Sequence, residues 1–400
     1  MNTPNVKVLY VLKRYPQLSQ TFVVRELIGL ESIGVTVGVD ALGQNDSGIR
    51  HPDVEMVAAE VRFLPRRPKV SRLPVLGAHV RGFVRHPARW LRTAVVEGRH
   101  DLRRFLQAGM VADRVHAQRF DLIHAHFATA AADVARMASS LSGVPFTVTA
   151  HAKDIYSDQH APWVAARLGA AAHVVTVSAF NVDHLRGLLP SVPVSLVRNA
   201  VVVGSRSSPV VEGPVLCVAR LVEKKGIDAL LRAVALVFED CPGLTVEIVG
   251  GGELKESLGA LAVDLGVGDS VTFLGSLPAD QVAEAYARAS MFVLPCRIGA
   301  DGDRDGLPTV IIEAMAHRLA VVSTDIIGIG EVVRHGETGL LVPEEDVDSL
   351  ATAIEKLWHD PNLRAFLGAN GRQLVADDFD PVTSASELRS IFRGARARPA

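Results

Sequence analysis

The chain has 400 residues, enough for two domains of ordinary size that each bury a core of their own. Its 42 Lys and Arg and 44 Asp and Glu leave a formal net charge of -2, which excludes a polyelectrolyte built to bind nucleic acid. Three scattered cysteines and the lack of a signal peptide or a long apolar run indicate an intracellular protein, without a disulfide framework, whose membrane contact is at most peripheral.

The N-terminus predicts a strand, a ligand-facing loop and a helix. Residues 6–12, VKVLYVL, form an apolar run rich in β-branched residues, which is typical of a strand buried on both faces of a parallel sheet. A polar loop then leads into a helix near Thr21, with Ser19 or Thr21 available as its N-cap. The segment VTVGVDAL predicts the next strand.

Residues 62–104 form a basic block that contains only Glu97 and Asp101 as acids. Phe83 and Trp90 are among the apolar residues interleaved with its cations, a pattern that predicts an amphipathic helical hairpin cut by Pro87. The block is either a solvated helical face or a contact with anionic lipid headgroups, worth ~1 kcal/mol per basic residue, and the interleaved aromatic residues favour lipid. Its cations are Arg62, Arg66, Arg67, Lys69, Arg72, Arg81, Arg85, Arg89, Arg92, Arg99, Arg103 and Arg104.

Four short apolar segments follow the basic block: FDLIHAHF, VPFTVTAH, AAHVVTVS and VPVSLVRN. They alternate with helical patterns, which predicts a doubly wound α/β domain whose ligands lie beyond the carboxyl ends of its strands. His126 and His151 fall at such ends. We therefore expect both histidines at one ligand-binding edge.

A second α/β unit is expected after a polar, proline-containing linker at 203–213. Its strands are VLCVAR, LTVEIVG, VTFLGSLP, MFVLPC, LAVVST and TGLLV, and the tail from Val347 onward is helical. We predict an N-terminal domain at 1–203, a second domain at 204–378, and a final helix at 379–400 that packs back on the first domain.

Two loops of the second unit carry residues suited to phosphate. In ARLVEKKGI, Arg220 and Lys225 share one loop with Gly226, and this pair suits a diphosphate, although two surface cations are the simpler interpretation. The loop IVGGGEL is glycine-rich, but Lys255 stands where a dinucleotide fingerprint requires its third glycine. This argues against a dehydrogenase.

The stretch at 301–316, DGDRDGLPTVIIEAMA, places Asp305 and Glu313 on either side of a turn, with Pro308 expected as the first helical residue. Two carboxylates at a helix start can accept hydrogen bonds from a polyhydroxylated ligand. A calcium loop is excluded by register, because Ile312 occupies the position that requires a bidentate glutamate. The D-x-D pairs that hold a divalent metal in some enzymes belong with another domain layout, so we expect no metal.

Taken in order, ARLVEKKG, IVGGGEL, FLGSLP and DGLPTVIIEAMA resemble the donor-binding half of the family-four retaining glycosyltransferases of the GT-B architecture. The resemblance covers essentially the whole chain. KRYPQLSQTFVVREL, LIHAHF and FTVTAHAKDIY further resemble the bacterial exopolysaccharide branch of that family, the colanic-acid type. The resemblance implies an α/β protein of two facing Rossmann-like, doubly wound parallel-sheet domains with an interdomain cleft.

The resemblance also implies residue roles. Arg220 and Lys225 would hold the donor diphosphate, and Glu313 the ribose. Asp305 takes the place of the first glutamate of the family's motif and would face the donor sugar, opposite His151. The remaining donor contacts would be Ser19, Thr21, Gly250, Leu277, Gly306, Leu307 and Pro308, with His126 on the acceptor side.

The expected function is that of a retaining hexosyltransferase, which moves a sugar from a nucleotide diphosphate sugar to a lipid-linked or oligosaccharide acceptor in bacterial exopolysaccharide or cell-envelope glycan synthesis. No metal or other cofactor and no nucleic-acid partner are expected. The protein would act in the cytoplasm, peripherally on the inner face of the plasma membrane. Two alternatives stay open: an epimerase or phosphorylase of the same fold, or a non-catalytic assembly protein that binds sugar nucleotides at the membrane, which Asp305 in place of glutamate favours.

Overall fold

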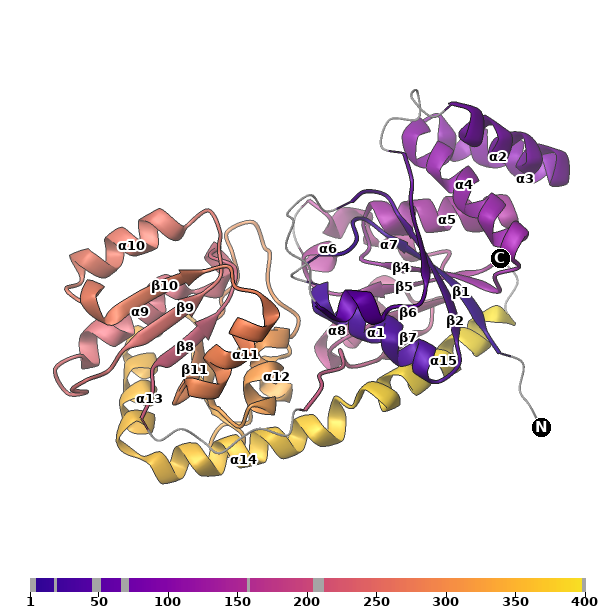
Figure 1. Cartoon of the computed structure of the whole chain (residues 1–400). Helices are drawn as coiled ribbons and strands as arrows, with labels where there is room; N and C mark the ends of the chain where they lie inside the picture. Colours follow the sequence, from indigo (N-terminus) through magenta and orange to yellow (C-terminus); the bar gives the residue numbers. More distant parts are fainter. Residues whose placement is uncertain are drawn as a thin grey trace. The chain divides into compact units, whose positions relative to one another are not determined.

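The computed structural model describes residues 5–17, 20–44, 52–65, 72–156, 159–203 and 212–397, and its elements are labelled in Figure 1. Two compact units divide the chain, and each is described by itself. The first comprises residues 1–177, 181–198 and 381–400, and the second comprises residues 178–180 and 199–380. Most of the predicted linker, 204–211, lies outside the described residues.

The sheet of the first unit has seven strands in the order β3-β2-β1-β4-β5-β6-β7, and all its neighbours are parallel. The strand order reverses between β1 and β4, which is the switch point where ligands of open α/β sheets bind. The strands are β1 (Lys7–Leu12), β2 (Thr36–Ala41), β3 (Glu60–Phe63), β4 (Leu122–His126), β5 (Phe146–Ala150), β6 (His173–Thr176) and β7 (Val194–Leu196).

Helices cover both faces of this sheet. Side chains alternate along β1, so that Val8 and Tyr10 pack with α1 and α15, whereas Leu9 and Val11 pack with α4 and α5. The helices and short turns of this part of the chain are α1 (Thr21–Ser32), η2 (Pro52–Met56), α2 (Arg72–Arg85), α3 (Pro87–Thr93), η3 (Ala94–Gly98), α4 (Leu102–Gln118), α5 (Ala130–Ser142), α6 (Lys153–Tyr156), η4 (Ala161–Trp163), α7 (Val164–Leu168), α8 (Ala179–Leu188) and α15 (Pro381–Arg396).

One detail of α1 differs from the sequence prediction. Gln20 is the N-cap, Thr21 is the first helical residue, and no side chain caps the helix. Ser19, the other predicted cap, lies outside the described residues. Of the two predicted caps, Thr21 is therefore wrong, because it is already the first residue of the helix.

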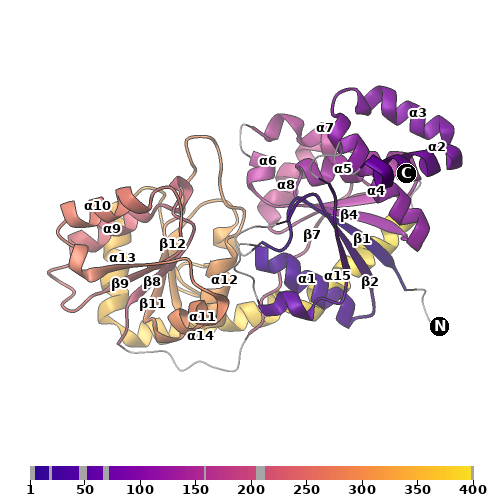
Figure 2. The same ribbon diagram turned by 45° about the horizontal axis from the view of Figure 1, so that its top comes forward.

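The predicted hairpin in the basic block is present as α2 and α3, separated at Pro87, which opens α3. The helix α2 packs on α4, so it lies one layer further from the sheet than α4 does (Figures 1 and 2). Arg66, Arg67, Lys69 and the side chain of Arg72 lie outside the described residues. The helices α2 and α3 therefore form an outer layer on the first unit.

The sheet of the second unit has six strands, again all parallel, in the order β10-β9-β8-β11-β12-β13. Its order reverses between β8 and β11, which makes this pair the switch point. The strands are β8 (Val215–Val218), β9 (Val246–Val249), β10 (Val271–Gly275), β11 (Met291–Leu294), β12 (Ala320–Thr324) and β13 (Leu340–Val342).

A single apolar core extends through the second unit, from β8 to the helix α14. Pro308 is the N-cap of α12 with an extended backbone, φ -65 and ψ 121, so its prediction as the first helical residue was wrong by one position. The helices and short turns of the unit are η5 (Glu223–Lys225), α9 (Ile227–Val237), α10 (Lys255–Asp264), η6 (Gly268–Ser270), α11 (Ala279–Arg288), α12 (Thr309–Ala316), η7 (Ile329–Glu331), α13 (Val347–His359) and α14 (Pro361–Asp378).

Candidate active site

In the second unit, two buried lysines lie in the turn that follows β8. Lys224 and Lys225 belong to the short helix η5, and Gly226 ends it with a φ of +61°. A Cβ atom on Gly226 would lie 1.9 Å from the carbonyl oxygen of Pro295, directly after β11. Only glycine therefore lets the loops after these two strands approach so closely at the switch point.

The two lysines face acids of the loop after β11. Lys225 Nζ lies 2.5 Å from Asp305 Oδ2, and Lys224 Nζ lies 3.0 Å from Asp305 Oδ1. Lys224 Nζ also donates to Asp303 Oδ1 at 3.0 Å. The side chain of Asp305 is 15% exposed, and those of the lysines 5% and 9%. We call these four residues the Lys–Asp cluster.

Within the Lys–Asp cluster, Asp305 and Lys225 stabilise each other's charged forms. Burial alone would raise the pKa of Asp305, but Lys225 and Lys224 together hold it well below its ordinary value. For Lys225, burial favours the neutral amine, yet the Asp305 carboxylate raises the pKa above its ordinary value. The nearby Cys296 thiol, whose Sγ lies 3.9 Å from Asp305 Oδ2, has a pKa raised to about 12 by burial and is neutral.

The other predicted donor residues of the second unit surround the same sheet edge. Arg220 is exposed in the loop after β8, close enough to Lys225 to oppose its protonation. Gly306 and Leu307 are buried just before α12, and Pro308 leaves the first backbone N–H groups of the helix without intrahelical partners. Glu313 is half-buried on α12 and accepts a hydrogen bond from the Tyr286 hydroxyl at 3.4 Å.

The predicted nucleoside loops follow β9 and β10. Gly250 has a φ of +137°, and a Cβ atom there would lie 1.8 Å from the carbonyl oxygen of Ala219 after β8. Its N–H donates to the carbonyl of Gly275 at the end of β10, two residues before the half-buried Leu277. The ends of β8, β9 and β10 therefore lie in close contact at Gly250. A Cβ atom at this position could not be accommodated.

In the first unit, His126 at the end of β4 and His151 directly after β5 form a buried hydrogen-bonded chain with α1. His126 Nδ1 lies 3.1 Å from His151 Nε2, and His126 Nε2 lies 2.9 Å from Glu26 Oε1. Tyr10 on β1 donates its hydroxyl to the same oxygen of Glu26 at 2.6 Å. Burial alone would raise the pKa of Glu26, but the neighbouring histidines and Tyr10 lower it to about 2.

A third histidine lies beside this chain. Glu26, His124 and His126 offer ligand atoms within 4.8 Å of one another, the spacing of a candidate metal site. However, His124 is hydrogen-bonded at Nδ1 to the Thr147 hydroxyl and at Nε2 to the Thr149 hydroxyl. Since His126 also uses both ring nitrogens, a metal could bind only by displacing existing partners. The three residues therefore fit a hydrogen-bonded network better than a metal centre.

The backbone around His151 is held by two side chains. The Asp154 carboxylate accepts from the N–H groups of His151, Ala152 and Ala128, and Asn181 donates to the His151 carbonyl at 2.6 Å. Thr21 lies at the start of α1, the helix that carries Glu26. His126 and His151 are thus brought together as the sequence predicts, at the switch point of the first sheet.

Two family models match the chain. "Glycosyltransferase Family 4" matches residues 50–204, and "Glycosyl transferases group 1" matches residues 208–374. The chain belongs to the family-four glycosyltransferases. The match to the second model contains the whole Lys–Asp cluster, and the match to the first contains both site histidines.

Individual relatives agree with this assignment. The chain is 38% identical to a GDP-mannose-dependent alpha-(1-6)-phosphatidylinositol monomannoside mannosyltransferase of Mycolicibacterium smegmatis, over 46% of this chain and 48% of that relative, so it matches about half of that enzyme's length. It is 26% identical to the putative colanic acid biosynthesis glycosyltransferase WcaL of Salmonella typhimurium, over 97% of this chain and 100% of that one.

Solved structures confirm the fold. Anabaena Alr3699/HepE, in complex with UDP and glucose, aligns with a TM-score of 0.73 at 18% identity, over 96% of this chain and 99% of that one. A glycosyltransferase from Rickettsia africae aligns with the same TM-score at 14% identity, over 99% of this chain and 100% of that one. The predicted GT-B fold of two Rossmann-like parallel-sheet units is confirmed.

Sequence reasoning missed several residues of this glycosyltransferase site. Lys224 was passed over beside Lys225, although both are buried. Glu26 gave a usable signal, because it stands three residues after Val23 and four before Leu30, on the apolar stripe of α1, where a charge requires a partner. The roles of Tyr10 and Asp303 depend on contacts between distant segments and left no local pattern.

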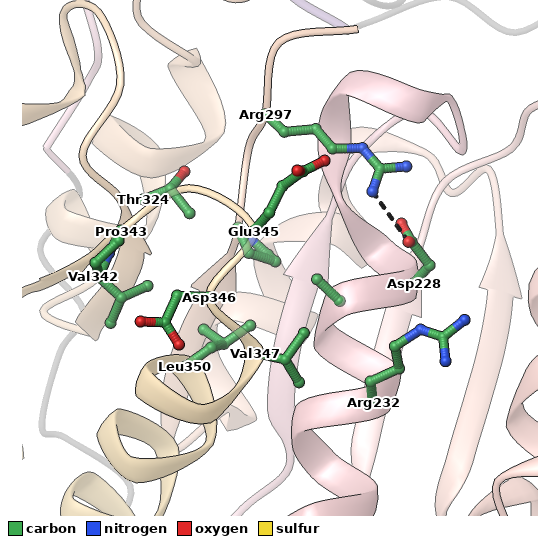
Figure 3. A pocket seen from close by; sticks show the side chains of 12 residues that line it. Asp228, Arg232, Arg297, Thr324, Val342, Pro343, Glu345, Asp346, Val347 and Leu350 are labelled. Atoms are coloured by element: carbon green, nitrogen blue, oxygen red, sulfur yellow. Dashed lines mark hydrogen bonds and ion pairs between the residues drawn. The ribbon is translucent and has the colours of Figure 1, made fainter. Parts of the chain in front are cut away.

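A cavity of about 140 Å³ lies elsewhere in the second unit, between α9 and the start of α13 (Figure 3). Asp228 and Arg232 line it from α9, and Asp228 pairs with Arg297 at 3.0 Å. None of the predicted donor residues is among its lining residues, as far as the chain is described. Because acids and arginines are mixed on its walls, the cavity shows no preference for a ligand of one charge.

Proposed function

We propose that this glycosyltransferase moves a hexosyl group from a nucleotide diphosphate sugar to a lipid-linked or oligosaccharide acceptor, in the synthesis of a bacterial exopolysaccharide or cell-envelope glycan. The observation that carries the proposal is the Lys–Asp cluster at the switch point of the second sheet. The names of the relatives support the substrate class: one depends on GDP-mannose, one serves colanic acid biosynthesis, and a structural neighbour holds UDP and glucose.

Three groups of the second unit suit the leaving nucleotide diphosphate. Lys225 supplies a buried positive charge, Arg220 can grip phosphate oxygens bidentately, and the start of α12 presents free backbone N–H groups. As the bond to the leaving group breaks, negative charge grows on the phosphate oxygens. Donors that are already oriented stabilise this charge without reorganising, which is the main way such sites accelerate transfer.

Asp305 suits the sugar. Its Oδ1 accepts from Lys224, and its Oδ2 accepts from Lys225 and, at 3.9 Å, from the Cys296 thiol, which leaves a lone pair on Oδ1 for a sugar hydroxyl. Lys225 has three N–H donors and uses one on Asp305, so it can bind a phosphate oxygen at the same time. Through Lys225, the positions of sugar and diphosphate would then be coupled. Glu313 would accept from the ribose hydroxyls.

The reaction exchanges one bond at the anomeric carbon. Its bond to the diphosphate oxygen breaks, a bond to the acceptor oxygen forms, and the acceptor proton passes to the departing phosphate oxygen. We propose that attack occurs on the face that the nucleotide leaves, with retention of configuration, so that no separate general base is needed. We further propose that the cations of the chain replace a metal, and that the reaction needs no other cofactor.

We propose that α2 and α3 hold the enzyme on an anionic membrane at the cytoplasmic face. The helix α2 exposes Leu73 (82%) and Val84 (74%), together with Leu76 and Val80 between them, although its opposite side packs on α4. Arg85, Arg92 and Arg103 of the same basic block are also exposed. Apolar side chains with flanking cations match the interior and the headgroups of an anionic bilayer. Among the described residues, no helix is both long and apolar enough to cross a membrane.

The test uses the purified full-length chain with UDP- and GDP-hexoses and a lipid-linked acceptor from polysaccharide synthesis. We expect acceptor-dependent release of a nucleotide diphosphate, undiminished by a metal chelator, and an unchanged anomeric configuration in the product. The proposal is refuted if the full-length chain neither transfers sugar nor binds a nucleotide diphosphate. Product formation without an acceptor would indicate an epimerase, and dependence on inorganic phosphate would indicate a phosphorylase.

A further inference from the structure

The geometry points to Glu26 as a positioning residue that acts on His151 through His126. Glu26 fixes the proton of His126 on Nε2, and His126 in turn fixes the proton of His151 on Nε2. His151 therefore presents the lone pair of Nδ1 as a hydrogen-bond acceptor for a hydroxyl of the bound sugar. The inference rests on the proposed function for the identity of the ligand, and on the hydrogen-bonded chain for the state of the ring.

The direction of the hydrogen bonds follows from their fixed end. An ionised carboxylate only accepts, so the His126 Nε2 at 2.9 Å from Glu26 must carry a proton. In a neutral imidazole the other nitrogen is then an acceptor, so His126 Nδ1 accepts from His151 Nε2 at 3.1 Å. This leaves His151 Nδ1 without a proton, and no described residue donates to it.

The opposite direction would need a buried cation. His151 could carry its proton on Nδ1 if His126 were protonated on both nitrogens. The His126 ring centroid lies 5.3 Å from that of His151 and 5.2 Å from that of His124, and all three side chains are buried. The Tyr10 hydroxyl already donates to Glu26 and so stabilises the carboxylate without a positive charge on His126. Burial also lowers the pKa of His124 to about 3 and that of His151 well below its ordinary value, so these two rings are neutral.

The residues around His151 restrict rotation of its ring. Phe127 and Phe22 pack against it with ring centroids at 4.5 and 4.8 Å, and both are apolar. Asp154 and Asn181 hold its backbone on either side. His126 is therefore the polar partner that orients the imidazole, and Glu26 is the group that orients His126.

An acceptor at this position suits a donor sugar whose hydroxyl points at His151. An N–H group there would instead donate to a sugar oxygen and could not accept the proton of a sugar hydroxyl. By fixing the proton on the far nitrogen, Glu26 would select the hydrogen-bond pattern before the substrate arrives. Such preorganisation removes the need to change tautomer during the reaction.

The first experiment reads the ring state without any substrate. The full-length protein is labelled with ¹⁵N in its 14 histidines, and the ring signals of His151 are assigned by their loss in His151→Gln. Long-range ¹H–¹⁵N correlation separates protonated from unprotonated ring nitrogens. We expect His151 protonated at Nε2 and unprotonated at Nδ1 at neutral pH. A proton on Nδ1 in the unaltered protein would overturn the inference, whatever the activity.

The second experiment measures transfer in Glu26→Gln, which keeps the size of the side chain but replaces an obligate acceptor by an amide whose NH2 group can donate to His126 Nε2. We expect kcat to fall on the order of 10-fold or more, KM for the donor to change less, and the Nδ1-protonated form of His151 to appear. Glu31→Gln, the same change on the same helix, is the matched control and should leave both readouts as in the unaltered protein. An unchanged His151 tautomer or an unchanged kcat in Glu26→Gln would overturn the positioning role.

The two failures can be told apart. If the unaltered protein transfers no sugar, the proposed function fails, while the spectra still decide whether Glu26 controls His151. If transfer occurs but the spectra show the opposite tautomer, only the inference fails. Thermal unfolding of each variant shows whether it is folded, and an additional Glu26→Asp variant, which restores the charge, should recover the His151 tautomer if Glu26→Gln perturbs packing.

Discussion

At the scale of single residues, a substitution of Lys225 distinguishes a binding site for diphosphate from a purely structural ion pair. We expect Lys225→Met to weaken binding of a nucleotide diphosphate by about 10-fold or more, because a charge-assisted hydrogen bond contributes ~1.5–3 kcal/mol. Titration calorimetry with UDP and GDP measures this loss. Lys356→Met, which removes an exposed lysine from α13, is the control. Equal affinities of the two variants would contradict a phosphate-binding role for Lys225.

Asp305 should stabilise the folded protein as well as bind substrate. Asp305→Asn leaves two buried lysines facing a neutral amide, and removal of one partner from a buried ion pair lowers the free energy of unfolding by ~3–5 kcal/mol. The depressed pKa of Asp305 gives the sign of the pH effect. The ionic contribution is present above the ordinary value of 3.8 and is lost as the pH falls below it.

Urea unfolding of the unaltered protein and Asp305→Asn at pH 7 and at pH 3 checks this prediction. The difference in unfolding free energy should be large at pH 7 and smaller at pH 3. A difference that grows towards pH 3 would show that Asp305 is not held as an ion by its lysines. Arg297, in the same loop, offers a matched control because it pairs with the more exposed Asp228, and Arg297→Met should change stability by less than ~1 kcal/mol.

The residues of the candidate site show how much of it could be predicted from the sequence. Motif order indicated Lys225, Asp305 and Glu313, because each stands in a local pattern with a chemical meaning. The partners of Asp305 could not be foreseen, since Lys224 precedes it by 81 positions along the printed numbering and approaches it only through the neighbouring strands β8 and β11. Sheet topology decides which acid pairs with which lysine. Local sequence patterns do not determine this topology.

At the scale of elements, α2 carries two apolar faces, one on α4 and one exposed. We expect the combined change Leu73→Gln, Leu76→Gln and Val80→Gln to reduce flotation with anionic liposomes several-fold, since the replaced side chains would lose their burial in lipid. The interaction should also weaken as salt is raised, because charged headgroups contribute. Thermal stability should change little.

The control replaces exposed apolar residues of the second unit, Leu236→Gln on α9 and Val263→Gln on α10. Flotation of this control should equal that of the unaltered protein. If both variants float equally well, α2 is not the membrane contact. The sequence predicted the hairpin and its arginines, but it did not separate the exposed apolar face from the face that packs on α4, because both repeat with nearly the same helical spacing.

The helix α15 reaches the histidine network of the first unit. Phe392 is fully buried, and its ring centroid lies 5.1 Å from that of His124 and 6.4 Å from that of Tyr10. We expect Phe392→Ala to lower the free energy of unfolding by ~3–5 kcal/mol, because it leaves a cavity against β1 and β4. Chemical denaturation measures the change, and Phe366→Ala, at an exposed position of α14, is the control.

At the scale of the whole molecule, each unit repeats one plan: a parallel sheet, a switch point, and charged or polar residues beyond it. The sequence predicted this plan well, because buried parallel strands are continuous apolar runs and their helices are amphipathic. It could not predict the strand order or the exact caps, which depend on contacts between distant segments. The misplaced starts of α1 and α12 are examples.

Removal of the chain after Asp380 should affect the first unit more than the second. The first unit loses α15, whose buried side chains pack on α1, whereas the second keeps all its strands. We expect the truncated protein to show faster amide hydrogen exchange in β1 and α1 than the full chain, with β8 and β11 unchanged. Equal protection of β1 in both proteins would contradict this prediction.

The place of α15 in the first unit has a consequence for synthesis on the ribosome. The strands and other helices of that unit are complete by residue 198, but its last helix begins at Pro381. At ~5–20 residues per second, the nascent first unit would wait on the order of 10–40 s for the helix that covers Tyr10 and Leu27. During that interval the apolar side chains that α15 buries stay exposed, which is the kind of surface that makes a nascent domain prone to aggregation and open to chaperones.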